Sequence, residues 1–168
     1  MNIIIRPETA ADISAIKSVT RRAFEFHPFS HQTEHFIVQA LRESGALSVS
    51  LVAEANGIVV GHIAFSPVGI ADGSPDWYAL GPISVIPEFQ QQGIGAELVR
   101  HGIKTLTGLS ARGCVVLGEP GFYGRFGFNP NPDLVLDGVP TEYFLSLTLV
   151  EGPVAGRVSY HAAFSSHG

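Results

Sequence analysis

The chain has 168 residues, of which 45% are hydrophobic and 15% charged, with a mean hydropathy of +0.25. This length fits one domain with a core large enough to fold without disulfides or a structural metal, and a single cysteine excludes a disulfide framework. Ten basic against fifteen acidic residues give a formal charge of -5, which argues against a nucleic-acid-binding protein.

The sequence shows no run near the roughly 20 apolar residues that a membrane-spanning helix needs. Its first eight residues lack the basic and long apolar segments of a secretory signal, so we expect a cytoplasmic protein without membrane contact. Composition becomes loop-like after about Glu151. We therefore expect a domain over residues 1–150 and a tail over 151–168, whose alternating apolar residues are able to add a strand.

The first part of the chain predicts one strand and two helices. Residues 2–6 form a short β-rich run, and the capping-box pattern from Thr9 to Asp12 opens a helix that His27-Pro28 closes. Ser30 is expected to cap a second helix that ends near residue 43.

Three β-rich runs follow. Residues 47–55 and 58–68 flank Asn56-Gly57, which predicts a hairpin. The third run, residues 77–86, contains Gly81-Pro82, and proline cannot donate to a strand ladder. That strand must lie at an edge, carry a bulge, or part from its neighbour near Pro82.

The remaining elements complete a mixed α/β fold in the order βααβββαβ(α)β. They are a helix at 93–106, a buried strand at 114–117, a helical turn at 121–125 and a strand at 144–150. Cys114 lies in the buried strand and is expected to be a small core residue rather than a nucleophile.

The junction before the long helix carries the sharpest chemical signal. Gly93 and Gly95 stand where the helix begins, so successive backbone N–H groups can point at one anion such as a pyrophosphate. A Rossmann loop would need a third glycine where Leu98 stands, and a Walker loop would need a Gly-Lys-Ser/Thr that the chain lacks.

Two segments resemble the GNAT superfamily of N-acetyltransferases. Gln90-x-x-Gly93-x-Gly95, preceded by Ile83-Ser84-Val85-x-Pro87, is similar to the family's acetyl-CoA signature, and residues 117–128 resemble its fifth strand and following short helix. The resemblance implies a GNAT acyl-CoA N-acyltransferase fold, an α+β mixed sheet in which strands four and five splay apart to admit the pantetheine arm of acetyl-CoA.

The resemblance also implies site residues. Acetyl-CoA would be the cosubstrate, with no metal, and an amine the acceptor. The cofactor-binding positions carried over are Ile83, Ser84, Val85, Gln90, Gln91, Gln92, Gly93, Ile94, Gly95, Ala96, Phe122, Tyr123 and Phe126.

For catalysis, the resemblance places Tyr123 as general acid and the Val85 backbone N–H as oxyanion donor. Glu119, Glu54 and His62 are each able to act as base through water, with Glu119 the candidate nearest the splay, or else an N-cap of the short helix. The identity of the amine, acyl chain length and the formation of a homodimer stay open.

Two alternatives remain. A sensor would keep the CoA cleft without turnover. A zinc hydrolase would use the H-x-x-E-H pattern formed by His31, Glu34 and His35, which lacks a third ligand in helical context. His27 extends the histidine spacing, but Pro28 separates it from that helix.

Overall fold

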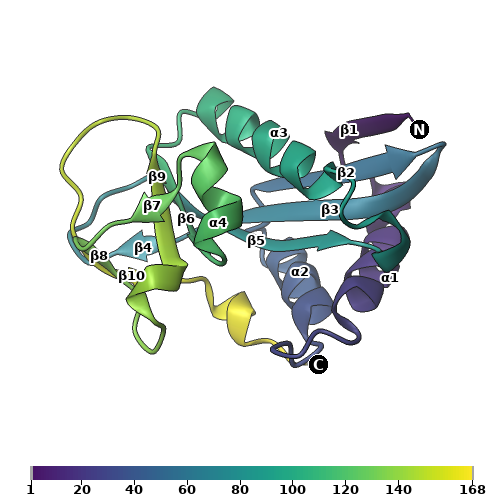
Figure 1. Cartoon of the computed structure of the whole chain (residues 1–168). Coiled ribbons are helices and arrows are strands. Elements are labelled where there is room, and N and C mark those ends of the chain that lie inside the picture. The colour runs from purple at the N-terminus through teal and green to yellow at the C-terminus, as the bar shows by residue number, and fades with distance from the viewer. Residues whose placement is uncertain (1, 168) are drawn as a thin grey trace.

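A computed structural model describes residues 2–167, and it places helices on both faces of a seven-stranded sheet with strand order β1-β2-β3-β5-β6-β9-β7 (Figure 1). The strands are β1 (Ile3–Pro7), β2 (Val49–Ala55), β3 (Ile58–Pro67), β4 (Gly69–Ile70), β5 (Trp77–Val85), β6 (Gly113–Leu117), β7 (Asn129–Pro130), β8 (Leu134–Val135), β9 (Phe144–Thr148) and β10 (Gly156–Ser159). The helices are α1 (Ile13–Phe24), α2 (Glu34–Glu43), α3 (Ile94–Gly108) and α4 (Pro120–Tyr123), with short 3-10 turns between elements. The mixed α/β class and the opening between the fourth and fifth long strands confirm the predicted fold.

The start of α1 follows the predicted capping box. The Thr9 backbone N–H donates to Asp12 Oδ2 at 2.7 Å, and a 3-10 turn at Ala10–Asp12 leads into the helix. The predicted cap of the second helix is wrong: α2 begins at Glu34, with Thr33 at its N-cap. Ser30 instead donates its hydroxyl to the Glu34 carboxylate at 2.7 Å, so it stabilises the loop before the helix.

The hairpin between β2 and β3 turns at the predicted dipeptide. Asn56 and Gly57 both have positive φ, 52° and 80°, as a two-residue type I′ turn requires. The two strands pair antiparallel from Val49↔Phe65 to Ala55↔Ile58. Their register fixes which side chains face each layer of helices.

The sheet separates two helical layers. On one face, Leu51, Ala53 and Ile63 join Leu98 of α3 in the largest buried cluster. On the other face, Val52 packs with residues of α1 and α2. Because side chains alternate along a strand, we call these the α3 face and the α1/α2 face.

A second, smaller sheet has the strand order β4-β10-β8. Its Ile70, Leu134 and Val158 form a buried cluster with Trp77 and Val115 on the main sheet. β4, β7 and β8 are absent from the predicted order, since two-residue strands give no periodic signal. In the tail, whose alternating apolar residues allow a strand, β10 pairs with β4 and β8. In the part of the chain that the structure describes, no helix has both the length and the apolar character needed to cross a membrane.

Candidate active site

Strands β5 and β6 part in the middle of the sheet. They pair in parallel only from Trp77↔Gly113 to Ala79↔Val115, although β5 continues to Val85. On its other side β5 keeps pairing with β3, where Gly81 and Pro82 together oppose a single residue of β3. The proline thus sits in a bulge, and the strands separate immediately beside it.

Backbone groups of β5 face the opening. The Ile86 N–H donates to the Val60 carbonyl at 3.0 Å, and in an antiparallel ladder every second residue is bonded to the same neighbour. The N–H and C=O groups of Ile83 and Val85 therefore point away from β3, toward the splay. Ser84 lies between them and turns its backbone to β3, while its side chain is buried on the α1/α2 face.

The loop from Ile86 to Gly93 ends in a group of backbone N–H groups without partners, at the start of α3. Gln91 and Gly93 have positive φ, 61° and 86°, and Gly93 is the N-cap of α3 without a side-chain cap. Glu97 N–H makes the first helical bond, to the Gly93 carbonyl at 3.1 Å. No backbone carbonyl among residues 2–167 accepts from the N–H groups of residues 91–96, so this loop and helix end are free to bind an anion.

Two glutamine side chains hold this loop in shape. Gln90 Nε2 donates to the Val85 carbonyl at 2.9 Å, and Gln92 Nε2 donates to the Glu88 carbonyl at 3.2 Å. Glu88 also forms an ion pair with Arg22 of α1. Gln90 therefore contacts the splay through its side chain, and Ile94 and Ala96 are buried beneath the loop.

Helix α4 lies beside the start of α3. A Cβ built on Gly95 would stand 3.8 Å from Phe122 Cζ, and the Phe122 and Phe126 rings are 5.4 Å apart. Arg125 Cζ lies 4.7 Å from the Phe122 ring centre and Arg100 Cζ 5.3 Å from that of Phe126. These two arginines, which the sequence patterns did not indicate, lie over the aromatic rings, and Arg100 also forms an ion pair with Glu97 at 2.8 Å.

Tyr123 packs at the base of the opening. A Cβ on Gly118 would lie 2.4 Å from Tyr123 Cε2, so only glycine admits the ring there. Burial, followed by the Cys114 thiol, raises the pKa of Tyr123 to about 12. No described residue hydrogen-bonds to its hydroxyl, which therefore stays protonated and free to donate at neutral pH.

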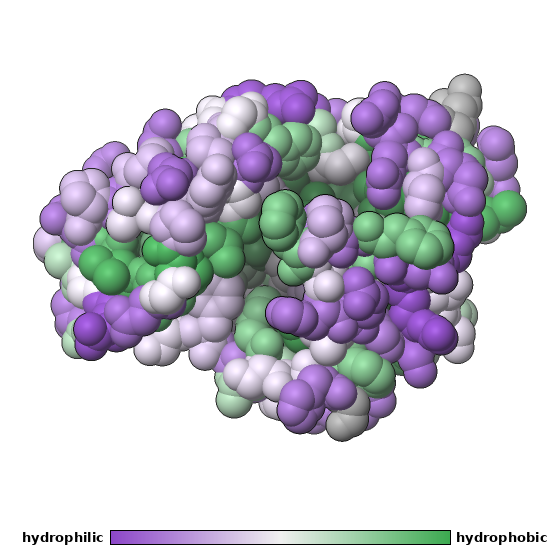
Figure 2. Space-filling view, turned by 60° about the horizontal axis from the view of Figure 1, so that its bottom comes forward, coloured by the Kyte–Doolittle hydropathy of each residue, from purple (hydrophilic) through white to green (hydrophobic). Residues whose placement is uncertain are grey.

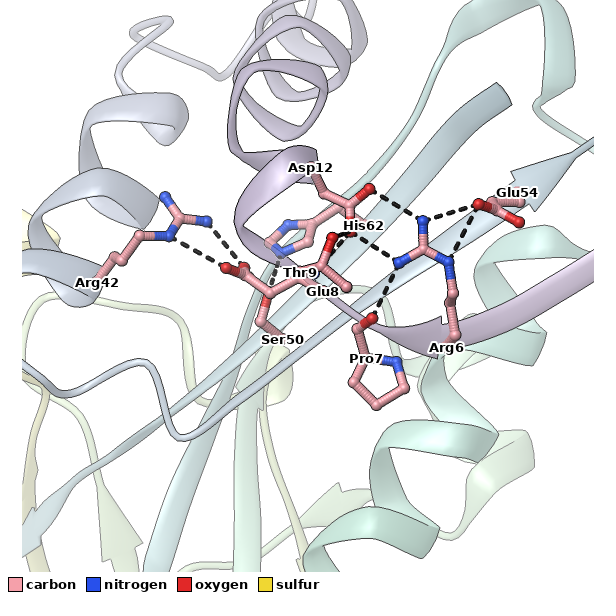
Figure 3. A network of polar contacts seen from close by, with 9 residues as sticks. All are labelled: Arg6, Pro7, Glu8, Thr9, Asp12, Arg42, Ser50, Glu54 and His62. Atoms are coloured by element: carbon pink, nitrogen blue, oxygen red, sulfur yellow. Dashed lines mark hydrogen bonds and ion pairs between the residues drawn. The ribbon is translucent and has the colours of Figure 1, made fainter. Parts of the chain in front are cut away.

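The three acidic or basic candidates differ in their surroundings. Glu119 is exposed at the N-cap of α4 and its side chain makes no cap bond. Glu54 forms an ion pair with Arg6 at 2.7 Å, and Arg6 also binds Asp12 (Figure 3). Among the three, only Glu119 lies at the end of β6 beside the splay.

His62 is fully buried on the α1/α2 face in a network that includes Glu8 and Ser50 (Figure 3). His62 Nε2 lies 2.8 Å from Ser50 Oγ, which donates to the Glu8 carboxylate, and Arg42 binds the same carboxylate at 2.8 Å. Burial lowers the pKa of His62 to about 4, against the opposing effect of Glu8. Glu8 and Ser50 are 42 residues apart, so no motif could have indicated this network.

The zinc-hydrolase pattern is not assembled. His31 is exposed in the loop before α2, whereas Glu34 and His35 lie within the helix. Among residues 2–167, no group of three or more histidine, cysteine, aspartate or glutamate side chains is arranged to hold a metal ion.

Comparison with known proteins gives consistent matches. The model of the Acetyltransferase (GNAT) family matches residues 15–128. The Escherichia coli K12 protein described as uncharacterized N-acetyltransferase YhbS is 33% identical over 171 residues, covering 97% of this chain and 99% of that protein. YjhQ, a second uncharacterized N-acetyltransferase of the same strain, is 38% identical over 125 residues, covering 71% of this chain and 66% of that protein.

Two solved structures are similar to this chain over nearly its whole length. A GNAT family acetyltransferase from Brucella melitensis in complex with acetyl-CoA is 46% identical with a TM-score of 0.86, covering 97% of this chain and 98% of that chain. Escherichia coli YhbS in complex with CoA is 32% identical with a TM-score of 0.90, covering 100% of this chain and 94% of that one. The splayed strands, the uncapped helix start and these matches lead to one assignment. The chain belongs to the GNAT family of acetyltransferases and is an enzyme of the acyltransferase class.

Proposed function

We propose that this enzyme transfers the acetyl group of acetyl-CoA to a primary amine, by direct attack within a ternary complex. The observation that carries the proposal is one continuous track of backbone groups that no neighbouring strand pairs, in which only the Val85 carbonyl has a partner, the Gln90 side chain. It runs from Ile83 and Val85 at the splay to the uncapped N-terminus of α3. Such a track suits a ligand with amides at one end and a pyrophosphate at the other.

The cosubstrate would be held mainly by backbone. Ile83 and Val85 would bind the amides of the pantetheine arm, while the N–H groups of Gln91, Gln92, Gly93, Ile94, Gly95 and Ala96 would bind the pyrophosphate. Gln90 and the aromatic residues Phe122, Tyr123 and Phe126 would border the arm. Ser84 would support this site from behind β5, since its side chain is buried on the α1/α2 face.

In the transfer step, the amine nitrogen forms a bond to the thioester carbonyl carbon and the carbon–sulfur bond breaks. The Val85 N–H would stabilise the negative charge on the carbonyl oxygen. Tyr123 would donate its hydroxyl proton to the leaving thiolate. Glu119 would take the proton that the amine loses, directly or through water, because its carboxylate is exposed and has no ion-pair partner among the described residues.

The proposal extends to the cellular location, the domain bounds and the acceptor of the enzyme. We infer a cytoplasmic enzyme whose catalytic domain covers residues 1–150, with residues 151–168 as a C-terminal extension. The acceptor is a separate diffusible or protein-borne amine, and the negative net charge of -5 favours a cationic one.

The test combines titration calorimetry with acetyl-CoA and an amine panel monitored by release of free CoA. The panel holds an alkylamine, a polyamine, an aminoglycoside, an amino-acid amide and a lysine peptide. We expect saturable binding of acetyl-CoA and transfer to at least one amine. Binding without transfer to any amine would favour a CoA sensor, and no binding by folded protein would overturn the proposal.

A matched pair of variants tests where the pyrophosphate binds. Gly95→Asp places a negative charge in the first turn of α3, which stabilises the helix itself but repels a phosphate. Gly95→Asn has nearly the same shape without the charge, and both side chains fit, since only Phe122 Cζ lies near, at 3.8 Å. We expect Gly95→Asp to weaken acetyl-CoA binding about 100-fold and Gly95→Asn by less than about tenfold. Equal affinities of the two variants would contradict the site.

A further inference from the structure

A groove of about 720 Å³ lies between α1 and α2 and is open to solvent. This α1–α2 groove has the size of a small-molecule site. Its wall includes Ser14, Lys17, Ser18 and Arg21 of α1, with His35 and Phe36 of α2. Figure 2 shows hydrophilic residues over most of the right-hand side of the molecule, where Figure 1 places α1. The groove therefore has room and access for a polar ligand.

The groove is separate from the acetyl-CoA site. No described residue of β5, of the loop before α3 or of α4 lines it. The α1 residues in its wall recur every three or four positions, so they share one side of the helix. The opposite side of α1 consists of Ile16, Val19 and Thr20, all of which are buried. The helix thus stands between the groove and the sheet.

Lys17 and Arg21 carry positive charge that the folded chain does not neutralise. They stand one turn apart on α1, and neither forms an ion pair with a residue in the range 2–167. Like charges at this spacing destabilise a helix. The helix dipole favours a cation in the last turn, where Arg21 lies, but gives no reason for Lys17 in the middle. Folding alone therefore does not account for the pair.

The other basic residues of the groove add no free charge. Arg22 forms an ion pair with Glu88, in the loop before α3. Burial, followed by the charges of Arg21 and Lys17, lowers the pKa of His35. Its imidazole is therefore mostly uncharged at neutral pH, and the free positive charge of the groove comes from Lys17 and Arg21.

The acidic residues of the groove lie toward its other end. Glu25 is two turns beyond Lys17 on α1, about 12 Å along the helix axis. Glu34 begins α2, after the loop that follows Glu25, and accepts the Ser30 hydroxyl at 2.7 Å. Charge is thus segregated along the groove, with its cationic end at residues 14–21.

We propose that this cationic end binds the phosphate group of a small anionic ligand. The Arg21 guanidinium and the Lys17 ammonium would each bind phosphate oxygens. The hydroxyls of Ser14 and Ser18, which flank Lys17 on the same side of α1, would donate to the remaining oxygens. A carboxylate has only two oxygens and would leave part of this donor set unused, so the set favours a phosphate.

The test titrates inorganic phosphate and ribose 5-phosphate into protein saturated with CoA, by calorimetry. CoA fills the anion site at the start of α3, so the heat reports the groove. Lys17→Gln and Arg21→Gln are compared with Lys104→Gln, a control that removes an exposed lysine from α3. We expect each of the first two to weaken phosphate binding about tenfold, and the control to change it less than about twofold.

Thermal unfolding separates lost binding from lost structure. The midpoint of Lys17→Gln should equal or exceed that of wild type, because the repulsion between Lys17 and Arg21 is removed. Weaker binding by a variant of undiminished stability then reflects the loss of a ligand contact.

The two probes also identify the source of the phosphate. Tighter binding of ribose 5-phosphate would assign an organic phosphate that extends along the groove, and equal binding would assign free phosphate. The inference is overturned if neither probe binds saturably to wild type at millimolar concentration, or if Lys104→Gln loses as much affinity as Lys17→Gln. A protein that does not bind CoA would contradict the cofactor site alone, since the comparison of Lys17→Gln with Lys104→Gln still tests the groove.

Discussion

Single buried polar side chains set the chemistry of this molecule at the residue scale. Tyr123 and His62 are both buried, but their hydrogen-bonding differs. The Tyr123 hydroxyl has no partner among residues 2–167, whereas His62 Nε2 is held by Ser50. The first arrangement leaves a proton to donate, and the second keeps an imidazole neutral inside the protein.

Replacing Tyr123 by phenylalanine removes the proposed proton donor and keeps the ring against Gly118. We expect kcat to fall about 100-fold, with little change in the Kd of acetyl-CoA. Since the pKa of Tyr123 is about 12, the wild-type rate should not decline with rising pH below about pH 10 on its account. Steady-state rates across pH check both statements, and an unchanged kcat would remove Tyr123 from the mechanism.

His62 makes stability depend on pH. Its pKa is about 4 in the folded chain against an ordinary value of 6.5, so the unfolded chain binds the extra proton between these values. Stability is then fully present above pH 6.5 and falls as the pH decreases toward 4, by about 3 kcal/mol in total. Urea unfolding at pH 7.0 and 5.0 measures this loss.

The matched variants for that measurement are His62→Gln and His101→Gln. His101 is exposed on α3, so its replacement controls for the loss of a histidine that is not buried. His62→Gln should flatten the dependence between pH 7.0 and 5.0, whatever its own stability. A dependence that survives in His62→Gln would assign the effect to another group.

The element that matters most for the site is α3, because its N-terminus supplies the free N–H groups. Its docking on β3 depends on Gly102, where an added Cβ would lie 2.3 Å from Cε1 of the fully buried Phe65. The position of the helix end, and with it the proposed anion site, therefore depends on one small residue about two turns away.

Gly102→Ala should lower the free energy of unfolding by at least about 2 kcal/mol, because Phe65 has no room to move. Gly108→Ala, in the last turn of the same helix, meets nothing within 4 Å and should leave stability unchanged or raise it by up to about 1 kcal/mol. Chemical denaturation of the two variants checks the difference. Equal stabilities would show that α3 docks less tightly than the contact implies.

Local sequence signals predicted those elements that depend on nearby residues. Asn56-Gly57 sets its own turn, Gly93 starts α3, and Pro82 requires an edge, a bulge or a separation of strands, so each was indicated by backbone preferences. Ser30 and Thr33 compete for one helix start, and the local pattern does not decide between them, because the choice depends on how the whole loop folds. The pairing of β10 with β4 and β8 was not predicted, because these partners lie far from it in the sequence.

Contacts between distant residues set the rest of the site. The Glu8–Ser50 hydrogen bond and the approach of Phe122 to Gly95 exist only after the chain has folded. Residue types and spacing carry no information about such pairs. Sequence patterns therefore indicate the backbone groups of the candidate site, whereas the placement of its side chains depends on the tertiary fold.

At the scale of the whole molecule, β5 connects the two buried clusters. Trp77, at its start, belongs to the cluster under the small sheet, and Leu80, three residues on, belongs to the cluster under α3. One rigid strand thus spans both parts, so we expect them to unfold together.

The single tryptophan makes this cooperativity measurable. Trp77 is only 2% exposed, so its fluorescence reports the smaller cluster, while far-ultraviolet circular dichroism reports all helices and strands. The two signals should follow one transition in urea. A fluorescence change at a lower urea concentration would show that the small sheet and the tail unfold first.

The bond from Gln90 to the Val85 carbonyl has a consequence for ligand entry. That carbonyl faces the splay, so in the free protein the chain's own side-chain amide occupies the position that an incoming amide needs. Binding of the pantetheine arm then replaces the Gln90 side-chain amide by an amide of the ligand, so the number of hydrogen bonds to the Val85 carbonyl does not increase. In the proposed mode of binding, affinity then comes from the charged end of the ligand, which would bind first at the helix terminus. Fragments that carry only the arm should therefore compete poorly, and selectivity among ligands is decided by whether an anion anchors them during the exchange.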